Sequence, residues 1–338
     1  MCEHLTTRQI CLRQITALIA AVFVFCGSSH VAIADPPVAK TQAAAETLNQ
    51  WSHARAKGGE HSAPPASAVT SPPAGSSMTP RARVYLFRGV LGPFFSRGMD
   101  SLTEEIQRAG VAADVYEFTI CSQIAAMAIQ DYRQDPTPII LIGHSMGGRC
   151  ILLFAETLQA EGIPVSLVVT IDPVHISPDI PLNVERFINI FLSKDVLGGG
   201  DIKPGQGFHG HYASYDLAQH GEVSHITIDK MDAVHQQLVA KIVELATTPP
   251  EAEGEIVPLR YVVPQSEEIE LWDSGTAVTA HSRDTLQTLA SRYHVPLWSL
   301  AQMNQAPDMA PLAAGQRVIV PRHLMPLATV SRPASRRH

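Results

Sequence analysis

The chain has little cysteine, no surplus of positive charge and no long apolar run. Among its 338 residues, 32 are Asp or Glu and 25 are Lys or Arg, so the formal net charge is −7 at pH 7. This acidic balance argues against nucleic acid or an anionic membrane surface as the main partner. The apolar run at 15–25 is shorter than the roughly 20 residues that span a bilayer, so we expect no transmembrane segment in the mature protein.

The first 34 residues have the features of a secretory signal peptide. Arg8 and Arg13 precede the apolar run, and Ala32 and Ala34 are small residues at the two positions that signal peptidase reads. We therefore expect cleavage before Asp35 and an exported protein, which is periplasmic, associated with the cell wall or secreted.

Three of the five cysteines fall within the expected signal peptide, which leaves Cys121 and Cys150. In an oxidising compartment these two can form a disulfide, but two buried free thiols on separate helices fit the sequence equally well. His209 and His211 form a His-x-His pattern, yet no carboxylate or cysteine partner has a recognisable metal-ligand spacing. We expect no metal and no cofactor.

The stretch 137–153, which reads TPIILIGHSMGGRCILL, contains the strongest motif. Apolar and mostly β-branched residues at 139–142 predict a strand buried on both faces, and an apolar stretch at helical spacing follows. Between them, Gly143, Ser145 and Gly147 form a G-x-S-x-G motif. A strand, this motif and a helix are typical of a nucleophile elbow, in which the glycines leave room for a sharp turn that exposes the serine hydroxyl.

Alternating strands and helices predict an α/β domain whose mostly parallel sheet is covered on both faces. The predicted strands are 84–87, 113–118, 139–142, 165–171, 187–192 and a last one near 222–228. The predicted helices are 99–109, 123–132, one from the elbow to about 161, and a final one that Asp229 is expected to cap.

Composition divides the rest of the chain. Residues 35–80 are rich in Ala, Pro, Ser and Thr and predict a disordered linker before the α/β domain at 81–247. A stretch rich in Pro and Glu, 248–275, is interpreted as a second linker. A small module at 276–322 and a basic tail at 323–338 complete the chain.

A serine nucleophile needs a histidine base and an acid that orients the histidine. His225 is the candidate base, because it follows both candidate acids and comes just before the final helix. Asp172 and Asp195 each follow an apolar strand directly, so both fit the order Ser, acid, His along the chain. Three other histidines are given lesser places: His144 and His175 as support or packing residues, and His235 on the solvated side of the final helix.

The negatively charged oxygen that forms during acyl transfer needs two backbone N–H donors. One is expected from Met146, directly after the nucleophile, and the other from Val90, in the loop after the first strand. Arg88 in that loop either contacts a charged substrate group or pairs with a neighbouring carboxylate, and we favour the pairing. The Gly-rich stretch 197–212 is a candidate mobile flap over the site.

The segment 81–246 resembles the α/β-hydrolase superfamily, especially minimal lipases and esterases. Its G-H-S-M-G elbow is similar to the G-H-S-x-G of lipases, although Arg88-Gly89 stands where the family has His-Gly. The segment 170–174 (TIDPV) resembles the segment that carries the acid in pancreatic-type lipases, which favours Asp172 over Asp195. The resemblance implies a serine hydrolase that acts on a lipid or small-molecule ester through an acyl-enzyme.

The segment 278–321 is similar to a LysM module, a βααβ unit that binds glycans containing N-acetylglucosamine, such as peptidoglycan or chitin. The matching residues are Asp284, Thr285, Leu286, Leu289, Ala290, Tyr293, Val295, Leu300, Asn304, Gly315, Gln316 and 318–321. Arg283 stands where the family usually has Gly. The resemblance implies a glycan-binding site that includes Arg283, Asp284, Thr285 and Asn304.

These features together predict an exported serine hydrolase tethered to peptidoglycan. Three alternatives stay open at this point. The enzyme can act on the wall itself, as an acyl hydrolase or amidase. The hydrolase domain can be an inactive scaffold in a glycan-binding protein, or the LysM fold can be kept only for dimerisation or stability. The acyl chain length and the oligomeric state are not encoded in any motif.

Overall fold

The computed structural model describes residues 80–248, 254–306, 309 and 311–325. The expected signal peptide, nearly all of the first linker and most of the basic tail lie outside these residues. No helix among the described residues is both long enough and apolar enough to cross a membrane.

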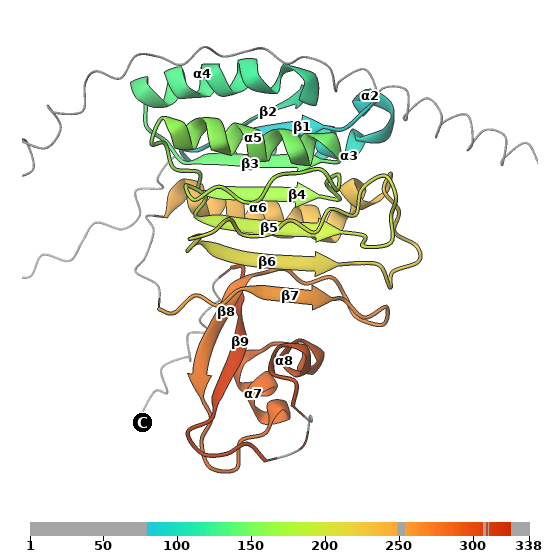
Figure 1. Cartoon of the computed structure of the whole chain (residues 1–338), viewed down its shortest axis with the longest axis vertical. Helices are drawn as coiled ribbons and strands as arrows, with labels where there is room; N and C mark the ends of the chain where they lie inside the picture. The colour runs from blue at the N-terminus through green and yellow to red at the C-terminus, as the bar shows by residue number, and fades with distance from the viewer. Residues whose placement is uncertain (1–79, 249–253, 307–308, 310, 326–338) are drawn as a thin grey trace, which may run out of the picture. The chain divides into compact units, whose positions relative to one another are not determined.

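The α/β domain is built on a seven-stranded sheet in the order β2-β1-β3-β4-β5-β6-β7, and every neighbouring pair is parallel (Figure 1). The expected fold class is therefore confirmed. The strands are β1 (Arg83–Arg88), β2 (Ala112–Glu117), β3 (Ile139–His144), β4 (Leu167–Ile171), β5 (Arg186–Phe191), β6 (His211–Asp216) and β7 (Leu259–Val262).

Helices cover both faces of this sheet (Figure 1). One face packs against α3 (Arg97–Arg108) and α6 (Asp232–Thr247), and the other packs against α4 (Cys121–Gln134) and α5 (Met146–Ala160). Successive side chains of a strand point to opposite faces. In β3, Ile140 and Ile142 join the first core, and Ile139 and Leu141 join the second. This explains why the strand reads as an unbroken apolar run.

The two remaining cysteines form a disulfide. Cys121 is the first residue of α4, and Cys150 lies in the first turns of α5. The bond joins the two helices that cover one face of the sheet. Of the two possibilities that the sequence left open, the structure therefore has the disulfide.

Two strands lie where the sequence predicted none. The first is β6 at 211–216, which begins within the stretch 197–212 that was expected to be a mobile flap. Its backbone pairs with β5 along its whole length. The stretch 259–262, interpreted as part of a linker, is β7 at the edge of the sheet. Both differences arise because neighbouring elements bury these residues, which local composition does not report.

The C-terminal unit contains a two-stranded antiparallel sheet and two short helices in βααβ order. Its elements are β8 (Trp272–Thr279), α7 (Leu286–Tyr293), α8 (Leu297–Asn304) and β9 (Arg317–His323). Its own core contains Leu286, Leu289, Leu300, Val318 and Val320. The βααβ arrangement is the one that the sequence predicted.

Candidate active site

Ser145 sits on a sharp turn between β3 and α5, with φ 57° and ψ −119°. Two close backbone approaches make this turn possible. A Cβ on Gly143 would lie 2.3 Å from the Gly147 carbonyl oxygen, and a Cβ on Gly147 would lie 2.2 Å from the Phe87 carbonyl oxygen. Since side chains at these positions would collide with backbone, the glycines of the motif are required by the local packing.

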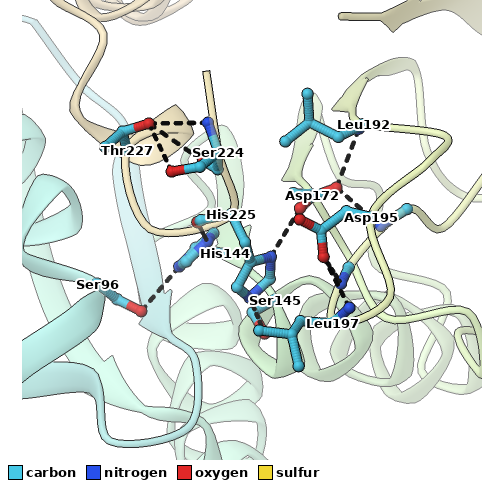
Figure 2. Close-up of polar contacts among 12 residues, drawn as sticks. Ser96, His144, Ser145, Asp172, Leu192, Asp195, Leu197, Ser224, His225 and Thr227 are labelled. Atoms are coloured by element: carbon cyan, nitrogen blue, oxygen red, sulfur yellow. Dashed lines mark hydrogen bonds and ion pairs between the residues drawn. The ribbon is translucent and has the colours of Figure 1, made fainter. Parts of the chain in front are cut away.

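The structure brings Ser145, His225 and Asp172 together at the carboxyl ends of the strands (Figure 2). His225 Nε2 lies 3.1 Å from Ser145 Oγ, and His225 Nδ1 lies 2.6 Å from Asp172 Oδ2. Asp172 is fully buried, and its second oxygen accepts hydrogen bonds from the N–H groups of Leu192 at 3.0 Å and Gly199 at 2.8 Å. These donors hold the carboxylate in place against His225.

His225 lies on a loop between β6 and α6, whereas the sequence placed it on or near a strand at 222–228. That prediction was wrong, because 222–227 contains turns and no strand, and a short 3-10 helix follows at Ile228–Lys230. The position relative to the final helix is nevertheless the expected one. A loop can bring the imidazole over the end of the sheet, where a strand in the sheet plane would not.

Asp195, the alternative acid, lies beside the same histidine without replacing Asp172. One potential ligand atom from each of Asp172, Asp195 and His225 lies within 4.8 Å of the others. The Asp195 carboxylate accepts hydrogen bonds from the N–H groups of Leu197 at 2.7 Å and Gly198 at 3.2 Å, and so shapes the following turn. His225 Nδ1 donates its hydrogen bond to Asp172. With Nδ1 held in this way, Nε2 faces the Ser145 hydroxyl, and the arrangement fits proton transfer between Ser145 and His225.

Two backbone N–H groups beside the serine are available for a substrate oxygen. Within the described residues, the N–H groups of Val90 and Met146 donate no hydrogen bond. Met146 is the first residue of α5, whose N-terminus places a partial positive charge next to the serine. A Cβ on Gly89 would lie only 2.7 Å from Ser145 Cβ, so the loop that carries Val90 touches the nucleophile.

Arg88 pairs with carboxylates, as the sequence favoured. Its guanidinium contacts Asp100 of α3 through two nitrogens and Glu117 at the end of β2 at 2.9 Å. The pKa of the arginine is raised, and the hydrogen bond to Asp100 is the main cause. Arg88 therefore braces the loop after β1 rather than offering a free charge to a substrate.

Two expectations next to His225 are wrong. Asp229 does not cap α6, because the residue before that helix is Met231; Asp229 is instead fully buried and accepts the Gly98 N–H at 2.9 Å. His235 is also buried, with Nε2 2.8 Å from the Asp229 carbonyl oxygen. Tight packing of α6 on α3 covers both side chains, and helical spacing alone could not show which face α3 would occupy.

The four residues expected to bind glycan have different surroundings. The Asp284 carboxylate is engaged by Arg292 at 2.6 and 3.1 Å and by the His281 N–H at 2.8 Å. Asn304 bonds through its amide to the backbone of Leu300 and Ile319. Thr285 caps α7, and Arg283 is exposed with φ 74°. Asp284 and Asn304 are thus occupied in holding the unit together, and Arg283 is the exposed charge of the set.

Ser96 is the one site residue that the sequence analysis missed. It is 1% exposed and lies directly before α3, with its hydroxyl 2.8 Å from Nδ1 of His144. No motif marks it, because the contact depends on how α3 packs against the end of β3.

Residues 279–321 match the family model of the LysM domain. The matched range contains the last residue of β8, both helices and most of β9, so it covers most of the βααβ unit. The chain therefore contains a LysM domain, as its sequence predicted. No curated protein sequence matches the chain.

Several solved structures are similar to the α/β part. A protein of Xanthomonas campestris pv. campestris, described as a hydrolase of the α/β superfamily, is 14% identical over 49% of this chain and 97% of its own, with a TM-score of 0.31. An esterase domain from Rhodothermus marinus is 16% identical over 37% of this chain and 69% of its own, with a TM-score of 0.27. The RedJ thioesterase of Streptomyces coelicolor is 17% identical over 35% of this chain and 52% of its own, with a TM-score of 0.23. Because every score is below 0.5, the fold rests on the strand order and pairing given above.

Proposed function

We propose that the protein is an exported serine hydrolase that cleaves an ester or thioester and is held at peptidoglycan by its LysM domain. The observation that carries the proposal is the hydrogen-bonded series Ser145, His225 and Asp172, in which each atom pair lies within 3.1 Å. Two further observations support the proposal. Ser145 lies on a sharp turn, and the backbone N–H groups of Val90 and Met146 beside it donate no hydrogen bond within the described residues.

The reaction follows from these positions. His225 Nε2 takes the proton of the Ser145 hydroxyl while Oγ attacks the substrate carbonyl carbon, and the N–H groups of Val90 and Met146 receive the oxyanion. Asp172 keeps the Nδ1 proton in place and stabilises the imidazolium. His225 then returns its proton to the leaving oxygen or sulfur. Water, activated by the same nitrogen, hydrolyses the acyl-enzyme and restores the serine.

The surroundings of the site favour an acyl group with an apolar chain. Large apolar side chains are exposed in the segments adjoining the proposed catalytic residues, namely Leu91, Phe94, Ile176, Val196 and Ile226. Exposed apolar side chains that gather in one region are typical of binding surfaces. Leu91 adjoins Val90, Ile226 adjoins His225 and Val196 adjoins Asp195, so these three side chains are candidates for contact with an acyl chain bound at Ser145.

A second candidate is action on the wall polymer itself, by removal of glycan acyl groups or by amide cleavage. The LysM match favours it, because a bound glycan would be the most concentrated substrate near the serine. The apolar side chains around the site favour the ester of an apolar acid instead, and we rank that first.

The test begins with the mature chain, 35–338, treated with a fluorophosphonate probe and with p-nitrophenyl esters from acetate to palmitate. Labelling is expected in the wild type and absent in Ser145→Ala, with turnover lost in both Ser145→Ala and His225→Ala. Asp172→Asn and Asp195→Asn form a matched pair. We expect about a thousandfold loss of kcat in the first, because the histidine loses the acid that orients it, and less than about tenfold in the second.

Each arm has a contrary outcome. A folded wild type that neither labels nor turns over any ester would leave a glycan-binding protein with an inactive scaffold. An equal loss in the two aspartate variants would contradict the assignment of Asp172. Sedimentation with purified peptidoglycan tests the LysM half separately, and release of acetate from O-acetylated peptidoglycan would favour the second candidate.

A further inference from the structure

His144 ends β3 directly before Ser145 and is 1% exposed. Burial, and secondarily the neighbouring His225, lower the pKa of His144 to about 3. The ring is therefore neutral at any pH near 7. A neutral imidazole carries one N–H donor and one nitrogen that can only accept.

The hydrogen bonds around the ring decide which nitrogen carries the proton. Nε2 lies 2.9 Å from the carbonyl oxygen of His225, and a carbonyl can only accept, so Nε2 must be the donor. Nδ1 is then the acceptor, and the Ser96 hydroxyl at 2.8 Å must donate to it. The same hydroxyl oxygen accepts the Gly89 N–H at 3.0 Å. All three bonds thus run in one direction, from Gly89 through Ser96 and His144 to His225.

This chain of bonds joins the three parts of the proposed catalytic site. Figure 2 shows its later part, from Ser96 through His144 to His225. Gly89 belongs to the loop that carries Val90. His225 is the proposed base, and its ring centroid lies 4.8 Å from that of His144. Ser145 is covalently joined to His144 as the next residue. One buried side chain therefore contacts, or is attached to, each part.

We propose that His144, oriented by Ser96 as the neutral Nε2–H tautomer, is a positioning residue that holds the Val90 loop and the His225 loop against the nucleophile. This proposal rests on the serine-hydrolase function proposed above. Neutrality matters to the reaction, because His225 becomes an imidazolium during attack and a second cation 4.8 Å away would oppose its formation.

A separate contact secures the other end of the His225 loop. The Gly98 N–H donates to Asp229 Oδ2, and a Cβ on Gly98 would lie 1.7 Å from the Asp229 carbonyl oxygen. The start of α3 thus holds the loop at 229 directly and at 225 through Ser96 and His144. Since the Asp229 contact does not depend on His144, loss of the His144 ring should misorient His225 and leave the loop attached.

The kinetic test compares His144→Phe, His144→Gln and Ser96→Ala in the mature chain, with p-nitrophenyl butyrate as substrate. Phe keeps a ring but no donor, whereas Gln keeps an N–H near the place of Nε2. We expect His144→Phe to lower kcat by about ten- to a hundredfold, the scale of a small misplacement of catalytic groups, with KM within about twofold. His144→Gln should recover most of the loss, and Ser96→Ala should fall between them. An unchanged kcat in His144→Phe, or equal losses in Phe and Gln, would overturn the proposal.

A spectroscopic test does not depend on the folding of any variant. In the wild type labelled with ¹⁵N-histidine, the His144 Nε2 should carry the proton and Nδ1 should not, unchanged from about pH 5 to 9. The Nδ1–H tautomer, or titration of His144 in that range, would overturn the proposal. A wild type with no esterase activity and no probe labelling would overturn the serine-hydrolase function and the role of His144 with it. An active wild type with an indifferent His144→Phe would overturn the role of His144 alone.

Discussion

Asp229 is a buried carboxyl group in the segment that carries His225. One oxygen accepts the Gly98 N–H, and the other has no hydrogen-bond partner among the described residues. Burial raises the pKa of Asp229 from 3.8 to about 6, although the charges of Lys230 and His235 act in the opposite direction. The unfolding free energy of the protein should therefore depend on whether Asp229 is protonated.

The sign of the pH effect follows from the direction of this shift. Between about pH 4 and 6 the folded protein keeps the Asp229 proton and the unfolded chain has lost it, so stability falls as pH rises through this range. Two pKa units correspond to about 3 kcal/mol. We therefore expect Asp229→Asn to raise the unfolding free energy at about pH 8 by roughly 2–3 kcal/mol and to change it little at about pH 4.

Urea denaturation of the two proteins at both pH values measures this effect. Asp232→Asn is the matched control, because that carboxylate is exposed at the start of α6 and should show little change at either pH. A wild type whose stability rises between pH 4 and 6 as much as that of Asp229→Asn would contradict the prediction.

At the scale of the element, the helices on one face of the sheet are joined covalently. The Cys121–Cys150 disulfide links α4 to α5, the helix that begins at Ser145, and closes a loop with a sequence separation of 29. In the chain-entropy model, a bond that closes a loop of this size lowers the entropy of the unfolded chain and so stabilises the folded protein by about 3–4 kcal/mol. The elbow helix gains its support from this bond and from the core beneath it.

We expect the double variant Cys121→Ser/Cys150→Ser to lose roughly 2–4 kcal/mol of unfolding free energy while keeping kcat within about twofold at room temperature. The wild type measured in a strong reductant should approach the stability of the variant. Equal stability of the oxidised and reduced wild type would show that the bond does not restrain the chain. A large loss of kcat at a temperature where the variant is folded would instead place α4 in the catalytic machinery.

Elements with a dense local signal were predictable from sequence, and those that depend on distant partners were not. β3 and its glycine turn were found because the apolar run and the motif are contiguous. β6 contains polar residues such as His211 and Ser214 that look like loop, yet partners from the C-terminal unit and β5 bury them. Likewise, Asp172 and Asp195 have the same local pattern, and only the position of the His225 loop distinguishes them.

At the scale of the whole molecule, the LysM domain and the parallel sheet share an aromatic cluster. Trp272 at the start of β8 and Trp298 of α8 pack with Tyr215 of β6 and Tyr261 of β7, with ring centroids 5.1 to 6.2 Å apart. The Tyr215 hydroxyl donates to the Trp272 carbonyl oxygen at 2.8 Å. These rings belong to the core of the sheet domain. The described part of the stretch 248–275, which was expected to be a linker, therefore packs against the sheet and joins the two domains; we call this contact region the joint.

Charged and polar contacts continue this joint on both sides of the cluster. Asp273 Oδ2 lies 3.2 Å from Arg186 Nε of β5 and 3.2 Å from His211 Nδ1 of β6, and all three side chains are buried. Gln302 of α8 bonds to the N–H and the carbonyl oxygen of Val262 on the edge strand β7. The LysM domain thus covers hydrogen-bonding groups that an edge strand would otherwise leave open to other chains.

Because the joint includes core residues of the sheet, we expect the two domains to unfold as one. The mature chain should show a single thermal transition. Trp298→Ala, which removes one ring of the cluster, should lower the unfolding free energy of that single transition by about 2–3 kcal/mol. Gln287→Ala, an exposed position on α7, is the control and should leave it within about half a kcal/mol.

Two alternatives give different melting curves. Independent domains joined by a flexible tether would melt in two steps, and Trp298→Ala would move only the step of the LysM domain. A chain ending at residue 265, which lacks the LysM domain, would then keep the melting temperature and esterase activity of the α/β domain. If the joint is as the contacts describe, that shortened chain exposes Tyr215 and Tyr261 and leaves Arg186 and His211 without Asp273. Exposure of these buried rings removes hydrophobic stabilisation, so the shortened chain should melt well below the full one.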